Sequence, residues 1–320
     1  MPQNRLVFDT DGGVDDAQAL LLLIANGRAP DAITTVFGNV GVEAATANML
    51  ATLAVAGIDI PVHVGAASGL VQPLIDARHV HGEDGLGGAP RPEKTGSPAS
   101  HDAVGFLRDT FRDAASRSEK VDILMIGPLT NLALALKLEP AIVAGIGQLT
   151  IMGGTIHGRG NVTATAEFNI FCDPEAASIV FEAGIDTVVV PWEPCVQHYL
   201  TGDEVNALFA NTPDSRLKTF SETLARHARQ TVAGFGGGDA FRFVDPFAAA
   251  VLVRPEIVLK STKAAVRVVL DQGIARGMTV VDPRGRLGVA DVTLVEEADR
   301  DQLTALYAAS IAFQPANANN

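Results

Sequence analysis

The sequence predicts an α/β fold, a single domain over residues 1–320 with an open, mostly parallel central sheet flanked by helices. Short apolar, β-branched runs alternate along the chain with longer alanine- and leucine-rich runs, as strands alternate with crossover helices in such folds. Most of the short runs end in Gly, Asn or Asp, and right-handed crossovers would place these ends along one edge of the sheet. At 320 residues and 47% hydrophobic composition, the chain can bury a large core. The expected architecture is therefore Rossmann-like, with ligands bound at that edge.

The first expected unit is a strand, a tight turn and a helix. Residues 6–8 are an apolar run, the Gly12-Gly13 pair breaks the chain, and residues 17–26 carry a helical pattern. The same alternation continues to residue 191. Strands or strand ends are expected at residues 33–37, 61–65, 121–126, 149–154 and 187–191, and helices at residues 44–56, 103–115, 132–138 and from Asp173-Pro174-Glu175 to Ala183.

Two segments interrupt this pattern. Residues 66–100 are rich in Gly, Pro and charge, and a loop this long inside a compact domain is usually functional. Residues 201–229 are mostly helical in pattern, and we expect residues 201–243 to form a helical lid over the active site. The last third is expected to hold a helix at residues 248–253 and strands at residues 264–270, 278–281 and 291–295.

Composition limits the functional classes. The net charge of −13 and pI of about 4.9 argue against nucleic acid or an anionic membrane as a partner. The two cysteines, Cys172 and Cys195, do not make a disulfide framework. The N-terminus lacks a signal-peptide apolar region, and no apolar run approaches the roughly 18 residues of a membrane span. We therefore expect a cytoplasmic protein.

Four carboxylates gather in the first turn, at Asp9, Asp11, Asp15 and Asp16. Like charges this close repel one another unless a cation neutralises some of them. Oxygen donors without a nearby Cys or His favour Ca²⁺ or Mg²⁺ over zinc. The alternative is a solvated acidic turn in which an Asp caps the helix. The sequence favours a divalent-metal site at the end of the first strand.

The motif Asp9-Thr10-Asp11-Gly12-Gly13-Val14-Asp15-Asp16 is similar to the N-terminal signature of the nucleoside hydrolases, the inosine-uridine-preferring family of N-ribosyl hydrolases. Other motifs follow in the family's order and approximate spacing, so the resemblance covers most of the chain. They are Gly38-Asn39, residues 81–87, residues 127–131, residues 152–154, Asn161, residues 166–169, residues 173–177 and Asp245-Pro246.

The resemblance implies one Ca²⁺ held by Asp11, Asp16, Asp245 and the backbone carbonyl of Ile126. Many family members have Thr where this chain has Ile126, but a carbonyl ligand does not depend on its side chain. Three carboxylates with carbonyls, waters and substrate hydroxyls would supply the six to eight oxygens that calcium prefers. By the same resemblance, Asp11 is the base that activates water, and Asp9 is structural.

The implied reaction is hydrolysis of the N-glycosidic bond of ribonucleosides to ribose and free base, in purine and pyrimidine salvage. A set of carboxylates and amides is expected to bind the ribose hydroxyls: Asp15, Asn39, Asn161, Glu167, Asn169 and Asp245. Each Asn alone is more often a turn or cap residue, and only the set favours ribose binding. His81, Phe168 and Met152 are candidates for the base pocket. Family members are commonly homodimers or homotetramers, and a homo-oligomer is expected here.

One position departs from the family pattern. The inosine-uridine-preferring branch has a His immediately before the last calcium-binding Asp, as the presumed acid for the leaving base, whereas this chain has Val244. Purine-specific branches lack this His and stack an aromatic side chain on the base, a role open to Trp192. The other candidate polar partners of the base are His81, His198, His227, Arg229 and Arg242.

Two alternatives compete with this interpretation. The strand followed by Asp9-Thr10-Asp11-Gly12 also resembles the haloacid-dehalogenase-like phosphatases, in which Asp9 would be the nucleophile and Asp11 the acid. Against this, Gly13 stands where that family has Thr, and no convincing Lys follows. The second alternative is a catalytically weak nucleoside- or ribose-binding protein, motivated by Val244. Retention of Asp11 favours the enzyme.

Overall fold

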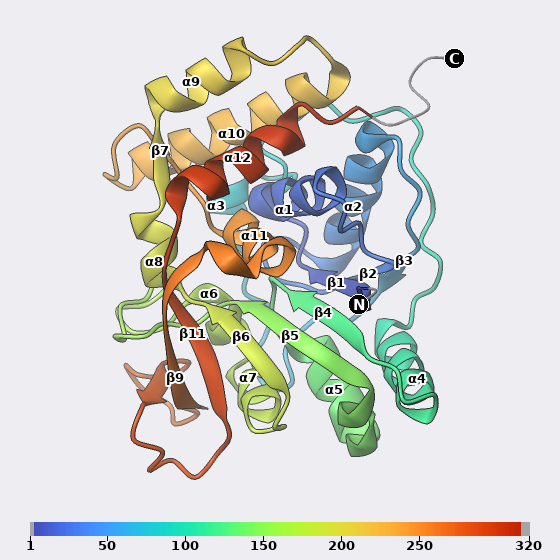
Figure 1. The fold of residues 1–320 in the computed structure, drawn as a ribbon, viewed down its shortest axis with the longest axis vertical. Helices are drawn as coiled ribbons and strands as arrows, with labels where there is room; N and C mark the ends of the chain where they lie inside the picture. Colours follow the sequence, from blue (N-terminus) through green and yellow to red (C-terminus); the bar gives the residue numbers. More distant parts are fainter. Residues whose placement is uncertain (1–2, 315–320) are drawn as a thin grey trace.

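A computed structural model describes residues 3–314 and contains one nine-stranded sheet between two layers of helices (Figure 1). The strand order is β10-β9-β11-β6-β5-β4-β1-β2-β3. The strands are β1 (Arg5–Thr10), β2 (Ala32–Thr35), β3 (Val62–Val64), β4 (Val121–Met125), β5 (Ile146–Met152), β6 (Asp186–Val190), β9 (Val258–Val268), β10 (Thr279–Asp282) and β11 (Asp291–Ala298). Neighbours from β3 to β11 pair in parallel, and β9 pairs antiparallel with β11 and β10. The predicted α/β fold with a mostly parallel sheet is confirmed.

The order of the strands reverses at β1. The chain runs from β1 outward to β2 and β3, and then returns to place β4, β5 and β6 on the other side of β1. Ligands bind at such a switch point, outside the carboxyl ends of the strands. The acidic turn follows β1 directly, and Ile126 follows β4, where its backbone N–H donates to the Asp9 carbonyl at 3.0 Å. Two of the three predicted metal-binding segments therefore lie at the switch point.

The helices cover both faces of the sheet (Figure 1). One layer holds α1 (Val14–Ala25), α2 (Val42–Ala56), α10 (Arg216–Gly234), α11 (Asp245–Val253) and α12 (Arg300–Ile311), and the other holds α4 (Ala103–Ser116), α5 (Thr130–Leu138) and α7 (Pro174–Phe181). In β1, Leu6 and Phe8 pack into the first layer while Val7 packs into the second, as expected from the two-residue repeat of a strand. Burial of both faces explains why the strands read as continuous apolar runs.

Shorter elements connect these layers. They are α3 (Arg78–His81), η1 (Pro140–Gly145), α6 (Phe168–Cys172), α8 (Trp192–Gln197), α9 (Gly202–Ala210), η2 (Pro255–Ile257) and the antiparallel pair β7 (Tyr199–Thr201) and β8 (Ala240–Arg242). Within residues 201–243, the helices are α9 and α10. No helix among residues 3–314 is long and apolar enough to cross a membrane.

Three sequence predictions about elements need correction. Helix α1 begins at Val14 rather than at residue 17, because Gly13 is its N-cap, so Asp15 and Asp16 belong to its first turn. The long loop at residues 66–100 contains the helix α3. The last third contains a second helix, α12, beyond the predicted one, and Asp299 caps it by accepting hydrogen bonds from the backbone of Asp301 and Gln302.

Candidate active site

The acidic turn is fixed by its glycines and by Asp16. Gly12 has a φ of +71°, and a Cβ there would lie 2.4 Å from the Cα of Ala45, so only glycine fits. Asp16 accepts hydrogen bonds from the Thr10 hydroxyl, from Asp11 N at 3.2 Å and from Gly13 N at 2.7 Å. A carboxylate at this first turn of a helix is stabilised by the free backbone N–H groups. Asp16 therefore holds the turn in shape.

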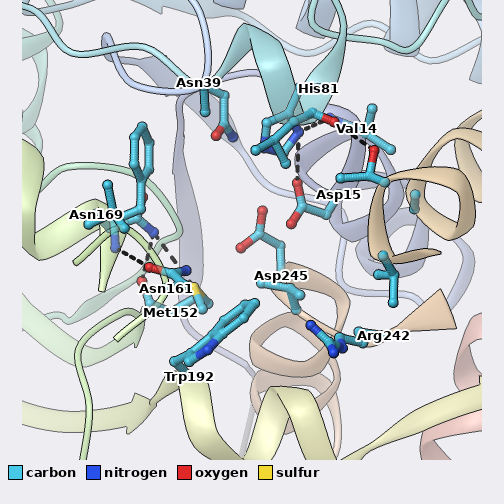
Figure 2. Close-up of a pocket in the computed structure, with 18 of the residues that line it drawn as sticks. Val14, Asp15, Asn39, His81, Met152, Asn161, Asn169, Trp192, Arg242 and Asp245 are labelled. Carbon is cyan, nitrogen blue, oxygen red and sulfur yellow. Dashed lines mark hydrogen bonds and ion pairs between the residues drawn. The ribbon is translucent and has the colours of Figure 1, made fainter. Parts of the chain in front are cut away.

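A group of three carboxylates lies at the N-terminal ends of two helices, α1 and α11. Asp15 and Asp16 are in the first turn of α1 and Asp245 is the first residue of α11, and one ligand atom from each lies within 4.8 Å of the others. Figure 2 shows the carboxylates of Asp15 and Asp245 next to each other in the cavity. Among the described residues, no hydrogen-bond partner reaches Asp15 Oδ1, which is buried. Three carboxylates, which carry the same sign of charge when ionised, therefore converge here.

Burial and repulsion set the charges of this group. Burial, and then the charges of Asp15, Asp16 and Asp11, raise the pKa of Asp245 well above its ordinary value. Burial raises the pKa of Asp15 to about 6. A positive charge placed among these carboxylates would offset their repulsion and favour their ionised forms. The donor set, all oxygen, suits a hard divalent cation.

Asp11 borders this group and is held by Asn39, which follows β2. Asp11 Oδ2 accepts the backbone N–H of Asn39 at 2.8 Å, and Oδ1 accepts Asn39 Nδ2 at 2.9 Å. Burial, followed by the charge of Asp16, raises the pKa of Asp11 well above its ordinary value. The group within 4.8 Å thus contains Asp15 in addition to the predicted ligands Asp16 and Asp245, and it does not include Asp11. Asn39 Nδ2 connects Asp11 to the group, since it lies 2.9 Å from both Asp11 Oδ1 and Asp16 Oδ2. The Ile126 carbonyl accepts Asn169 Nδ2 at 3.0 Å.

Glu167, Asn161 and Asn169 form another wall of the cavity. Glu167 caps α6 and accepts hydrogen bonds from Gly154 N at 2.9 Å and Asn169 N at 3.0 Å. Burial nevertheless raises the pKa of Glu167 to about 7. Asn161 Oδ1 accepts Phe168 N at 2.9 Å, which ties the loop before α6 to the helix. The three side chains that resemble a ribose-binding set therefore line one cavity.

The cavity has a volume of about 470 Å³ and contains most of the predicted site residues. Its lining includes Asp15, Asn39, His81, Ile126, Met152, Asn161, Glu167, Phe168, Asn169, Trp192, His227, Arg242, Val244 and Asp245. Asn39 and His81 lie on one side of Asp15 and Asp245 in Figure 2, and Trp192 and Arg242 lie on the other. A volume of this size accommodates a small molecule.

His81 is fixed as a neutral side chain. Its Nδ1 accepts Val14 N at 3.2 Å and lies 3.6 Å from Asp15 Oδ1. Burial lowers the pKa of His81 to about 4. Because Nδ1 accepts a hydrogen bond, the proton belongs on Nε2. The turn that carries His81 is bound to α10, since His227 Nε2 and the Thr231 hydroxyl both contact the Val80 carbonyl, at 2.9 and 3.0 Å.

Two polar candidates lie outside the cavity, and their assignment to the base is corrected. His198 is buried, with its ring nitrogens 2.8 Å from the Pro194 carbonyl and 3.0 Å from the Ala298 carbonyl. Arg229 forms a bidentate ion pair with Asp239, with both N···O distances at 2.7 Å. Both side chains are engaged in holding the fold.

Asp9 also lies outside the cavity lining, below the acidic turn. It is fully buried, and its Oδ2 accepts hydrogen bonds from Thr34 and from Asn131, at 2.5 and 2.8 Å. Burial raises the pKa of Asp9 to about 7. These contacts join β1 to β2 and α5, so Asp9 has a structural role.

Helix α10 contributes residues that the sequence argument missed. Ala228, Thr231 and Val232 of α10 line the cavity, together with Phe235, the C-cap residue that follows the helix. Their spacing, together with His227, follows one face of a helix, which could have identified them. Nothing in the sequence shows that this face is turned toward the acidic turn.

Comparisons with known proteins match nearly the whole chain to proteins of the same kind. A family model described as inosine-uridine preferring nucleoside hydrolase matches residues 6–305. The non-specific ribonucleoside hydrolase RihC of Salmonella typhimurium is 40% identical over 287 residues, which cover 89% of this chain and 89% of that protein. A plant nucleoside hydrolase, PpNRh1, superposes with a TM-score of 0.89 at 30% identity, covering 97% of this chain and 99% of its own. An inosine-guanosine nucleoside hydrolase superposes with a TM-score of 0.87 at 28% identity, covering 98% and 100%.

Proposed function

The chain belongs to the inosine-uridine preferring nucleoside hydrolase family and is a ribonucleoside N-glycosyl hydrolase, and we propose that it uses Asp11 as the base and a calcium ion held in the acidic turn. The observation that carries this proposal is the position of Asp11. Asn39 holds its carboxylate beside the group of Asp15, Asp16 and Asp245.

The chemistry of the donors supports a calcium ion. The unpartnered oxygen of Asp15 fits a cation bound between α1 and α11, as do the burial and repulsion that raise the pKa of Asp245. Asp11, Asp16, Asp245 and the Ile126 carbonyl would hold it, with Asp15 facing the same space. When bound, calcium supplies positive charge that orients a water molecule and the sugar hydroxyls.

The reaction breaks the bond between C1′ of ribose and a nitrogen of the base. The bonding electron pair leaves with the base, and the sugar acquires oxocarbenium character. Water adds to C1′ while Asp11 accepts its proton, which requires an ionised Asp11. The two hydrogen bonds from Asn39 stabilise that ionised form and fix its direction.

The remaining polar residues support binding of the ribose. Asp15, Asn39, Asn161, Glu167, Asn169 and Asp245 all line the same cavity. Carboxylates and amides suit vicinal hydroxyls, and a sugar lacking one of them leaves buried polar groups unpaired. The base would then extend toward His81, Phe168 and Met152, the predicted base pocket, and toward α10.

The phosphatase alternative does not fit this arrangement. Its nucleophile would be Asp9, which is fully buried and hydrogen-bonded to Thr34 and Asn131. These hydrogen bonds hold the Asp9 carboxylate against β2 and α5, which fits a structural role rather than that of a nucleophile.

The proposal is tested with purified protein and Ca²⁺ on inosine, adenosine, guanosine, uridine and cytidine, with ribose measured as reducing sugar. We expect ribose release from ribonucleosides, and a kcat/KM about 10⁴-fold lower on 2′-deoxyribonucleosides. The Asp11→Asn variant is the matched inactive control. Binding of nucleosides without release of ribose would instead indicate a binding protein, and equal cleavage of deoxyribonucleosides would contradict the ribose contacts.

A further inference from the structure

Arg242 lines the cavity and lies close in the chain to Val244, which stands where the usual histidine is missing. It is the last residue of β8 and lies two residues before Val244. Both residues line the cavity. The Arg242 guanidinium carbon lies 6.0 Å from the ring centroid of Trp192, within the range of a cation–π contact. Figure 2 shows Arg242 beside Trp192 and on the Asp245 side of the cavity.

The Arg242 side chain makes no hydrogen bond or ion pair with any residue between 3 and 314, although it is half-buried. Two more deeply buried arginines contrast with it. Arg28 lies 2.9 Å from Asp122, and Arg276 lies 2.8 Å from Glu175. A buried guanidinium normally finds acceptors, because it carries five donors and keeps its charge. The donors of Arg242 are therefore available to a molecule in the cavity.

A glycine leaves room for this side chain. A Cβ added at Gly237, in the segment that follows α10, would lie 2.9 Å from Arg242 Nη2. Gly237 therefore allows the guanidinium to lie against the backbone of this segment, while Trp192 is its other neighbour. Neither of these two neighbours accepts a hydrogen bond from the guanidinium.

The reaction creates a need for such a group. Cleavage of the C–N bond leaves an electron pair on the base. The side chain of Val244 can donate neither a proton nor a hydrogen bond to it. An arginine does not give up its proton, but it stabilises negative charge by hydrogen bonding. Pyrimidine O2 and purine N3 are the acceptors that the bases share beside the glycosidic nitrogen. A donor to this position would serve all the common bases.

We propose that Arg242 stabilises the departing base by donating hydrogen bonds to it, in place of the missing proton donor. The inference rests on the proposed nucleoside hydrolysis. In this scheme the electron pair of the broken C–N bond stays on the base, Arg242 keeps its proton, and the base takes its proton from solvent after cleavage.

The test compares leaving groups that need stabilisation with one that does not. Wild type, Arg242→Met and Arg242→Lys are assayed with uridine, inosine and p-nitrophenyl β-D-ribofuranoside, whose p-nitrophenolate leaves without protonation. Arg242→Met should lower kcat on both nucleosides by about 10²–10³-fold, the usual loss for one charge-stabilising donor. On the nitrophenyl riboside the loss should stay below about tenfold, and Arg242→Lys should recover part of the loss on nucleosides. Arg226→Met is the matched control, because Arg226 is exposed on α10 and does not line the cavity.

Each other outcome has a definite meaning. Unchanged nucleoside turnover in Arg242→Met would overturn the inference, as would an equal loss on all three substrates with an unchanged melting temperature. If Arg242→Met fails to fold, the same two comparisons are made with Arg242→Lys. A wild type that is inactive on every nucleoside contradicts the proposed function itself. An active wild type with an equally active Arg242→Met contradicts only the role of Arg242.

Discussion

Asn39 donates two hydrogen bonds to Asp11, from its backbone N to Oδ2 at 2.8 Å and from its side-chain Nδ2 to Oδ1 at 2.9 Å. The same Nδ2 lies 2.9 Å from Asp16 Oδ2. Asn39 therefore fixes the distance and direction of Asp11 relative to the acidic group. A close approach of Asp11 to Gly38, where an added Cβ would lie 2.0 Å from Asp11 Oδ2, restricts it further.

The first prediction concerns this contact. Asn39→Ala removes the side-chain donor but keeps the backbone donor, so Asp11 keeps its place but loses its orientation. We expect kcat to fall by about 10²-fold, since small misplacements of a reacting group cost this much. Asn39→Asp should lower kcat and the melting temperature further, because it adds a carboxylate to an already acidic group. Steady-state kinetics and thermal melts test both, and a kcat unchanged in Asn39→Ala would show that Asp11 needs no such support.

The second prediction separates two carboxylates of the same motif. Asp11→Ala should lower kcat by about 10²–10⁴-fold through loss of the base. Asp9→Ala should keep more activity but lower the free energy of unfolding by about 1–3 kcal/mol, because Thr34 and Asn131 lose a buried acceptor. Kinetics and urea unfolding of the two variants give the comparison. Comparable activity in Asp11→Ala and wild type would refute the base assignment.

The third prediction concerns removal of the metal. Chelation with EGTA should abolish turnover and lower the melting temperature, because Asp11, Asp15, Asp16 and Asp245 then repel one another in a buried site. Calcium present at 100 times its dissociation constant should restore about 2.7 kcal/mol of stability. Calorimetry with and without added Ca²⁺ measures the effect, and Asp16→Asn should show a smaller calcium-dependent shift. Full activity after exhaustive chelation would exclude a metal requirement.

The fourth prediction concerns acid stability, far from the cavity. Both Glu204 carboxylate oxygens lie 2.6 Å from Arg300 Nη2, and hydrogen bonding to Arg300 lowers the pKa of Glu204 to about 2. A folded-state pKa below the unfolded value of about 4.3 stabilises the protein above that value. This contribution is lost as the pH falls from about 4.3 toward 2.

Glu204→Gln should therefore melt below wild type at pH 7, and the difference should shrink between pH 5 and pH 3. Glu222→Gln, an exposed change on α10, is the control for loss of a negative charge. A difference in melting temperature that stays constant with pH would mean that Glu204 acts through packing alone.

The sequence was most informative where burial was nearly complete. The strands near β1 are apolar runs because helices cover both faces, so their positions and the fold class could be predicted. The start of α1 was misplaced because Asp15 and Asp16 were assigned to the turn. Gly13, as N-cap, in fact lets the helix begin before them. Helix α12 was missed, although Leu303, Leu306, Tyr307 and Ile311 bury one helical face.

The candidate site could be predicted only in part, for a physical reason. Residues that end parallel strands meet at one edge, so Asp11, Asn39 and Ile126 could be placed together. The direction of a side chain beyond that edge depends on contacts between distant segments. His198 and His227 look equivalent in the sequence, yet His198 contacts backbone carbonyls in the core and His227 lines the cavity. The same holds for Arg229, which Asp239 binds, and for Arg242.

Asp16 lies near the start of the chain and Asp245 about three quarters of the way along it, on helices α1 and α11 that pack against each other. During synthesis on a ribosome, the first six strands would emerge before α11 does. The nascent protein would therefore hold most of its sheet while its acidic turn still lacked Asp245. Catalytic competence would be acquired late in translation, and a truncated product ending before α11 would lack the last carboxylate of the site.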